Sequence, residues 1–207
     1  TWLPSGFFGV DVFFVLSGFL MASLYRPDAW RAVADYLLRR ARRILPAYFV
    51  VIVLTVVAAA FVVLPHELST VVGHAYFASA FLPNVGFWLD DSYFSNLQFK
   101  PLLHLWSLGV ELQFYLLFPL AAWVLRRSVP ALLVICSYAA CLAVLAVSPK
   151  TAFFMTPFRL WQFGLGMVAA ACASRLVQGF GATRASRAGA CALLVLLPCF
   201  ALHVPEA

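Results

Sequence analysis

Long apolar stretches, separated by short polar ones, run through the whole chain and predict a membrane protein made of helices. A helix needs about 20 apolar residues to cross a bilayer. Stretches that approach this length cover residues 6–25, 44–64, 103–125, 130–147, 153–173 and 188–202. We therefore expect an all-α fold, a polytopic transmembrane helical bundle with about six spans.

The polar stretches between these spans predict how the chain is oriented. Arginines follow the first span, at Arg26, Arg31, Arg39, Arg40, Arg42 and Arg43. Residues 26–43 are typical of an amphipathic interfacial helix, which we expect to be kinked at Pro46 where the second span begins. Residues 65–101 are mixed in character and predict an extracytoplasmic loop, within which residues 71–82 form a partly inserted helix. This topology places every arginine cluster on the cytoplasmic side.

Composition supports the membrane interpretation. Of the 207 residues, 64% are hydrophobic and 11% are charged, whereas about a quarter of a soluble domain is charged. The mean hydropathy is +0.95. These values exclude a soluble enzyme, a disordered chain and a disulfide-stapled secreted domain. The 14 basic and 8 acidic residues give a net charge of +6, which we attribute to membrane orientation and anionic lipid and not to a nucleic-acid partner.

Several weaker patterns predict close packing of helices and no bound metal or other cofactor. The cysteines lie in apolar stretches without a C-x-x-C pair, as small packing residues do. His66 and His74 fit no standard zinc spacing, so we predict no metal site. Gly166, Ala170 and Ser174 are four residues apart and predict a small-residue seam between helices. The chain begins and ends beside apolar stretches, and we expect it to be a piece of a longer protein.

Ionisable residues inside predicted spans indicate a functional or structural role, because burying them in a bilayer costs several kcal/mol. Asp11 lies in the first span, where it either supports a functional group or pairs with an arginine or a helix end. His104 and Glu111 open the third span seven residues apart, so on one helix they share a face with Ser107 and Tyr115 nearby. These side chains either handle protons or form a hydrogen-bond network between helices.

Three arginines are candidates for binding an anion. Arg40 and Arg43 are three residues apart and project from one helical face. Two guanidinium groups can bind phosphate through paired hydrogen bonds, but ordinary cytoplasmic charge explains the pair equally well. Arg159 is interpreted as an interfacial anchor, with a role in ligand binding as the alternative.

Several stretches taken together resemble the acyltransferase 3 family of integral membrane O-acyltransferases. They are, in chain order, residues 6–20 (GFFGVDVFFVLSGFL), 40–48 (RARRILPAY), 93–94 (YF), 101–115 (PLLHLWSLGVELQFY) and 157–166 (PFRLWQFGLG). Each stretch is modest evidence by itself, but their order and spacing match across most of residues 6–170.

The resemblance implies a domain of about ten spans, of which this chain holds a part. It implies transfer of an acyl group, commonly acetyl, from acyl-CoA to a hydroxyl of an envelope glycan such as O-antigen, peptidoglycan or exopolysaccharide, in the bacterial inner membrane. Acyl-CoA is then a substrate, and no bound cofactor is implied. Arg40 and Arg43 correspond to the R-x-x-R pair that meets the donor, and Glu111 corresponds to the glutamate of the W-S-L-x-x-E motif.

Two positions depart from the family pattern. The family's histidine base lies upstream of residue 1, so this stretch by itself is expected to be inactive. The usual second glutamate is replaced by Leu112. Asp11, His104, Ser107 and Glu111 remain supporting candidates that could orient the base or the acceptor. The alternatives are a transporter or flippase of envelope lipids, with Asp11 and Glu111 as a proton path, or a non-catalytic membrane scaffold.

Overall fold

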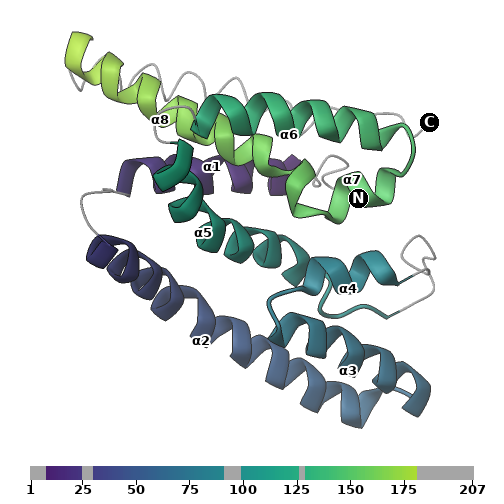
Figure 1. Ribbon diagram of the computed structural model, residues 1–207. Coiled ribbons are helices and arrows are strands. Elements are labelled where there is room, and N and C mark those ends of the chain that lie inside the picture. Colours follow the sequence, from purple (N-terminus) through teal and green to yellow (C-terminus); the bar gives the residue numbers. More distant parts are fainter. Residues whose placement is uncertain (1–7, 25–29, 91–98, 126–128, 181–207) are drawn as a thin grey trace. The chain divides into compact units, whose positions relative to one another are not determined.

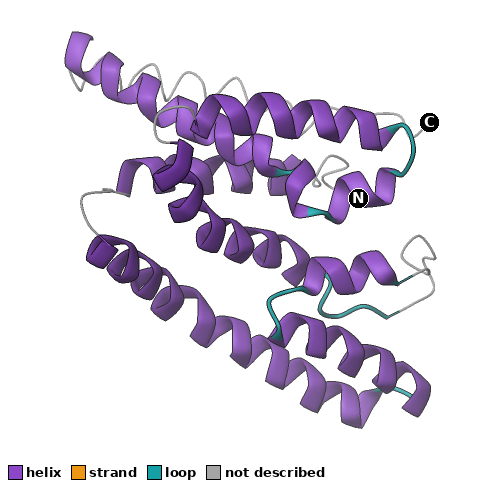
Figure 2. Ribbon diagram, viewed as in Figure 1, coloured by secondary structure: helices purple, strands orange, loops and turns teal. Residues whose placement is uncertain are grey.

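The computed structural model describes residues 8–24, 30–90, 99–125 and 129–180. This part of the chain is all-helical, as predicted, and contains no strand (Figure 2). The helices are α1 (Phe8–Leu24), α2 (Trp30–Val62), α3 (Pro65–Ser79), α4 (Pro83–Leu89), α5 (Leu105–Leu125), α6 (Val129–Leu145), α7 (Pro149–Phe154), the 3-10 turn η2 (Thr156–Phe158) and α8 (Leu160–Phe180). The predicted span at residues 188–202 and the pair at residues 93–94 lie outside the described residues.

Helix α1 and the part of α8 from Gln162 onward belong to one compact unit. Their backbones meet at two glycines. A Cβ atom at Gly166 would lie 1.9 Å from the carbonyl oxygen of Val15, and one at Gly18 would lie 2.1 Å from that of Phe163. Beside this contact the ring of Phe14 stacks on Phe163 with 4.9 Å between centroids. The predicted small-residue contact is therefore confirmed at Gly166, where the missing side chain lets two helices touch.

Helices α2 to α7 belong to a second compact unit. In it α3 packs against α2, α4 lies against α3, α5 and α7, and α7 packs on α6 (Figure 1). The predicted interfacial helix and the predicted second span form one helix, α2. It is 33 residues long and is not interrupted at Pro46. A proline inside a helix removes one backbone hydrogen bond, and the apolar turns on both sides maintain the rest.

Two predicted elements have different bounds in the structure. The helix expected at residues 71–82 begins at Pro65 and ends at Ser79. A proline in the first helical position favours this start, and the Glu67 carboxylate accepts a hydrogen bond from the Leu64 N–H at 3.3 Å. The predicted span at residues 153–173 is interrupted before α8 by the turn η2. Its Pro157 lacks the N–H that an uninterrupted helix would use.

One helix in the described residues is long and apolar enough to cross a membrane, over Val33–Val62 of α2. Shorter apolar helical stretches cover Gly9–Ser23, Pro130–Leu145 and Leu160–Ala173. The multi-pass arrangement stays a prediction.

A polar cluster in the second unit joins α3, the end of α4, the segment before α5, and α7. Its members are His74, Asp90, Lys100 and Lys150, and we call it the Asp90 junction. The Asp90 carboxylate lies 2.9 Å from Lys100 Nζ and 3.4 Å from His74 Nε2, and Lys150 Nζ donates to the Asp90 carbonyl oxygen at 2.7 Å. The His74 ring lies on Phe87, 4.3 Å between centroids.

The pKa of His74, which lies outside the predicted spans, is lowered from its ordinary 6.5 by burial. The Lys100 charge lowers it further, while the Asp90 charge and hydrogen bond oppose the shift. The imidazole is therefore held neutral in the folded protein at neutral pH.

We expect this histidine to make the protein less stable in mild acid. Unfolded His74 binds a proton near its ordinary pKa of 6.5, whereas the folded protein resists protonation. The stabilisation is thus complete above that pKa and is lost as the pH falls through the folded pKa. The measurement is the midpoint of thermal unfolding across this range, for the natural protein and for His74→Gln. An equal pH dependence of the two midpoints would contradict the prediction.

Candidate functional site

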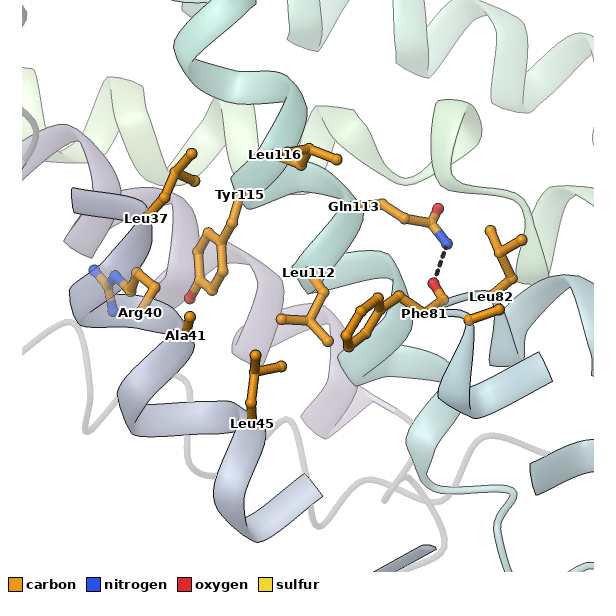
Figure 3. A pocket seen from close by; sticks show the side chains of 11 residues that line it. Leu37, Arg40, Ala41, Leu45, Phe81, Leu82, Leu112, Gln113, Tyr115 and Leu116 are labelled. Carbon is orange, nitrogen blue, oxygen red and sulfur yellow. Dashed lines mark hydrogen bonds between the residues drawn. The ribbon is translucent and has the colours of Figure 1, made fainter. Parts of the chain in front are cut away.

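Helices α2 and α5 and the turn between α3 and α4 enclose a cavity of about 400 Å³, which we call the Arg40 cavity (Figure 3). Its lining residues are Leu37, Arg40, Ala41, Leu45, Ala80, Phe81, Leu82, Leu112, Gln113, Tyr115 and Leu116. Most of this wall is apolar. The polar side chains in the wall are Arg40 from α2 and Gln113 and Tyr115 from α5.

Arg40 is a buried cation in the wall of this cavity. The residue is 9% exposed. Its guanidinium carbon lies 5.1 Å from the ring centroid of Tyr115 and 5.7 Å from that of Tyr36, so two aromatic faces stabilise the charge. Among the described residues, its Nη2 atom has no hydrogen-bond partner. Buried N–H groups nearly always have an acceptor, so this arginine has the property expected of a group that binds an anion.

Glu111 is connected to Arg40 through Tyr115. The carboxylate is buried, with 4% of the residue exposed, and Glu111 Oε1 accepts a hydrogen bond from the Tyr115 hydroxyl. The Tyr115 ring in turn meets Tyr36 edge to face, with centroids 6.4 Å apart. One tyrosine therefore contacts a buried negative charge through its hydroxyl and a buried positive charge through its ring, which reduces the cost of burying both.

A network of amide and hydroxyl groups holds the other side of the cavity. Gln113 Nε2 donates to the Phe81 carbonyl oxygen at 3.0 Å (Figure 3). It also donates to Asn84 Oδ1 at 2.7 Å. Asn84 Nδ2 donates to the Phe154 carbonyl at 3.1 Å, and the Thr156 hydroxyl donates to Gln113 Oε1. Phe81 has a φ of 60°, a conformation that costs energy for a bulky residue and persists where neighbours enforce it.

The structure separates some residues that the sequence grouped. Arg40 is buried in the cavity wall, whereas Arg43 is exposed and is not part of that wall. His104 is exposed in the turn before α5, and Glu111 is buried inside the helix. The Ser107 hydroxyl donates to the His104 carbonyl oxygen at 3.2 Å. Of the candidates on this part of the chain, Arg40 and Glu111 are the two that Tyr115 links.

Asp11 belongs to the other unit. Its Oδ1 atom accepts a hydrogen bond of 2.6 Å from Gln162 Nε2, which connects α1 to α8. Gln162 is thus one partner of this carboxylate, and its predicted pairing with an arginine or a helix end stays a prediction. A carboxylate held by an amide donor keeps a defined orientation inside this unit.

The match to a family model covers residues 1–205, and the model is described as an acyltransferase domain. The chain belongs to the acyltransferase 3 family. It is 40% identical over 124 residues to a Staphylococcus aureus (strain COL) protein provisionally named an O-acetyltransferase, covering 57% of this chain and 20% of that protein. It is 36% identical over 136 residues to the O-acetyltransferase OatA of Staphylococcus aureus (strain NCTC 8325), covering 62% of this chain and 22% of OatA.

The chain therefore spans about a fifth of the length of these relatives. No solved structure matches it significantly.

Sequence reasoning missed the contacts made by Tyr36, Asn84, Gln113 and Thr156. A signal was available for Gln113, an amide two residues after Glu111 in an apolar stretch. No local pattern indicated Asn84 or Thr156, because their partners are 29 to 72 positions away. Tyr36 precedes Arg40 by one helical turn, a spacing that places the two side chains on one face.

The arrangement provides a desolvated positive charge, a buried carboxylate and an apolar volume within one part of the fold. No group of three or more histidine, cysteine or acidic side chains that could hold a metal ion occurs within the described ranges. The chemistry that this arrangement can support is therefore recognition of an anion next to a hydrophobic moiety, with a carboxylate nearby to orient hydrogen-bonding groups.

Proposed function

We propose that the protein containing this chain is a membrane O-acyltransferase. It transfers an acyl group, in the first place acetyl, from acyl-CoA to a hydroxyl of an envelope glycan such as O-antigen, peptidoglycan or exopolysaccharide. The proposal rests on membership of the acyltransferase 3 family and on relatives that are named O-acetyltransferases. The donor and the class of acceptor follow the family resemblance.

One observation carries the donor site. Arg40 is buried beside an apolar cavity and has an Nη2 atom without a partner in the described residues. In this proposal Arg40 and the exposed Arg43 bind negative charge on the donor, and the cavity receives an apolar part of it. A guanidinium forms strong, oriented hydrogen bonds with phosphate oxygens, which a lysine at the same place would not reproduce.

The reaction joins the acceptor oxygen to the carbonyl carbon of the thioester. The hydroxyl proton leaves to a base, negative charge develops on the carbonyl oxygen, the C–S bond breaks, and CoA departs as a thiol once it receives a proton. We assign Glu111 and Tyr115 to positioning Arg40 and the groups near the donor. The family's histidine base is expected upstream of residue 1.

We place the protein in the bacterial inner membrane as a multi-pass protein. Support comes from the apolar stretch Val33–Val62 and the shorter apolar helices, and from the arginines that follow the first predicted span. The donor then binds from the cytoplasmic side and the glycan from the other side.

The donor site is tested by removing the two arginines together. For Arg40→Ala with Arg43→Ala, we expect the affinity of the full-length protein for CoA to fall at least about tenfold, because hydrogen bonds between charged groups are lost. The measurement is equilibrium binding of CoA to protein in lipid nanodiscs.

The chain offers a matched control. Arg39→Ala with Arg42→Ala removes two exposed arginines at the same spacing on the same helix. Equal losses in the two double variants would show a general effect of surface charge, and unchanged CoA binding by the first would contradict the donor site. Arg40→Lys, which keeps a cation between the tyrosines, distinguishes lost folding from lost phosphate recognition.

A further inference from the structure

The Arg40 cavity has more room than an acetyl group fills. Its volume is about 400 Å³, and roughly a dozen molecules the size of water would occupy that volume at about 30 Å³ each. Leu37 and Leu45 both line it from α2, and their spacing corresponds to about 12 Å along a helix axis. The methyl group of an acetyl thioester takes up a small part of this space. The size of the cavity therefore indicates a longer occupant.

Arg40 differs from the other polar side chains of the cavity wall, because it has a donor atom without a partner. The Tyr115 hydroxyl donates to Glu111. Gln113 Nε2 donates to the Phe81 carbonyl oxygen, and Gln113 Oε1 accepts a hydrogen bond from a hydroxyl of η2. Arg40 Nη2 has no hydrogen-bond partner in the part of the chain that the structure describes. The wall therefore presents this guanidinium donor to a ligand beside leucine, alanine and phenylalanine side chains.

This distribution of polar groups distinguishes between the parts of an acyl-CoA molecule. The pantetheine arm carries amide and hydroxyl groups, and burying them in an apolar cavity without partners costs free energy because they lose their hydrogen bonds to water. The acyl group has a carbonyl oxygen at one end and only hydrocarbon beyond it. A donor atom next to an apolar wall matches this pattern. The acyl group is therefore the part of the donor that suits the cavity.

Leu112 has a central position in the cavity wall. It precedes Tyr115 by three residues and Leu116 by four, so the three side chains lie on one face of α5. The Tyr115 ring lies 5.1 Å from the guanidinium carbon of Arg40. Figure 3 shows Leu112 between Arg40 and Phe81. A hydrocarbon chain that begins at Arg40 and extends toward Phe81 therefore passes Leu112.

Phe81 forms an end wall of the cavity that is held in a defined position. Its carbonyl oxygen accepts the hydrogen bond from Gln113 at 3.0 Å. Its ring stacks on Tyr48 and meets Phe49 edge to face, with 6.0 Å between centroids in each pair. These contacts enforce the φ of 60°, which a bulky residue adopts only where its neighbours impose it. A fixed end wall limits the length of chain that the cavity can hold.

We propose that the Arg40 cavity is an acyl-chain pocket, and that the protein accepts donors with acyl groups longer than acetyl as well as acetyl-CoA. The inference rests on the proposed function and names the donor class of the same site. The carbonyl oxygen of the thioester faces Arg40 Nη2, and the chain extends past Leu112 toward Phe81. The exposed Arg43 meets the phosphates of CoA. Negative charge that develops on the carbonyl oxygen during transfer then lies beside a desolvated guanidinium, which stabilises it.

The test is the affinity of the full-length protein for acyl-CoA molecules of increasing length. Equilibrium binding of acetyl-, butanoyl- and hexanoyl-CoA would be measured in lipid nanodiscs, and binding to empty nanodiscs would be subtracted. We expect the affinity to rise by about fourfold for each methylene that the cavity buries. Leu112→Phe, which fills part of the cavity, should lower the ratio of hexanoyl-CoA to acetyl-CoA affinity at least about tenfold. The matched control is Leu117→Phe, an exposed position on the same helix outside the cavity wall, and it should leave the ratio unchanged.

Three results would overturn the proposal: equal affinity for acetyl- and hexanoyl-CoA, a ratio that Leu112→Phe does not lower, or an equal fall of the ratio in Leu117→Phe. Leu112→Met conserves volume and should keep the ratio, which separates the shape of the cavity from loss of fold. Tight binding of acetyl-CoA without any gain from a longer chain would contradict the acyl-chain pocket and leave the acyltransferase proposal standing. Failure of every acyl-CoA to bind would contradict both.

Discussion

Replacing Glu111 with glutamine is expected to lower acyl transfer by the full-length protein about 100-fold, the scale of the loss when groups positioned for the reaction shift by about 1 Å. Glutamine matches the shape of the side chain and still offers an oxygen to the Tyr115 hydroxyl. It does not carry the negative charge that balances Arg40 through the tyrosine ring. The variant therefore changes the electrostatics of the site while the packing is kept.

The readout has to separate this effect from simple loss of fold. Initial rates with labelled acetyl-CoA would be compared with those of Asp35→Asn, which removes an exposed carboxylate from α2, and thermal unfolding would be recorded for both. We expect kcat to fall in Glu111→Gln and the KM for the donor to rise with it, because Glu111 is proposed to position Arg40, one of the two arginines proposed to bind the donor. A rate equal to that of Asp35→Asn would show that Glu111 has no part in transfer.

Alanine at Gly18 or Gly166 is expected to destabilise the protein by about 3 kcal/mol or more, near the upper end of what overpacking costs. The added Cβ would lie 2.1 Å from the Phe163 carbonyl oxygen in the first variant and 1.9 Å from the Val15 carbonyl oxygen in the second. Both atoms are backbone, so no rotation of a side chain relieves the clash. α1 must move away from α8, which disrupts the hydrogen bond between Gln162 and Asp11.

Gly9 is the matched control because it also lies in α1 and nothing lies within 4 Å of the position its Cβ would take. Gly9→Ala should be neutral or stabilise the protein by about 0.5–1 kcal/mol, since alanine restricts the unfolded chain and favours the helix. Unfolding midpoints in detergent would measure all three variants. Similar midpoints for Gly18→Ala and Gly9→Ala would show that α1 and α8 do not meet as described.

Local patterns were sufficient to predict the helical class and to single out Arg40 and Glu111, two residues of the candidate site. A long apolar stretch in a low-dielectric environment folds as a helix, because each backbone N–H and C=O group must form its hydrogen bond within the same segment. A charge in such a stretch stands out, and this singled out Glu111 before any contact was known. The same patterns gave the wrong bounds around Pro65 and Pro157, where proline begins or interrupts a helix that hydropathy alone would extend.

The pairing of residues within the site depended on where helices cross. The sequence gives no means of telling which of Arg40 and Arg43 is buried, because they lie three residues apart on one helix. Only Arg40 is covered by Tyr115 of α5 and buried, while Arg43 is exposed. Burial of a helix face is set by the neighbouring helix, and spacing along one helix does not contain that information.

By itself, the sequence determined the helical class, the family, and the candidate residues Arg40 and Glu111, because composition, apolar length and motif order are properties of short segments. The tertiary structure decided that Tyr115 links these two residues, that Asn84, Gln113 and Thr156 form one network, and that Asp90 joins four segments. Contacts between positions far apart in the chain exist only after the helices have packed, and the loop closure that brings them together leaves no local mark in the sequence.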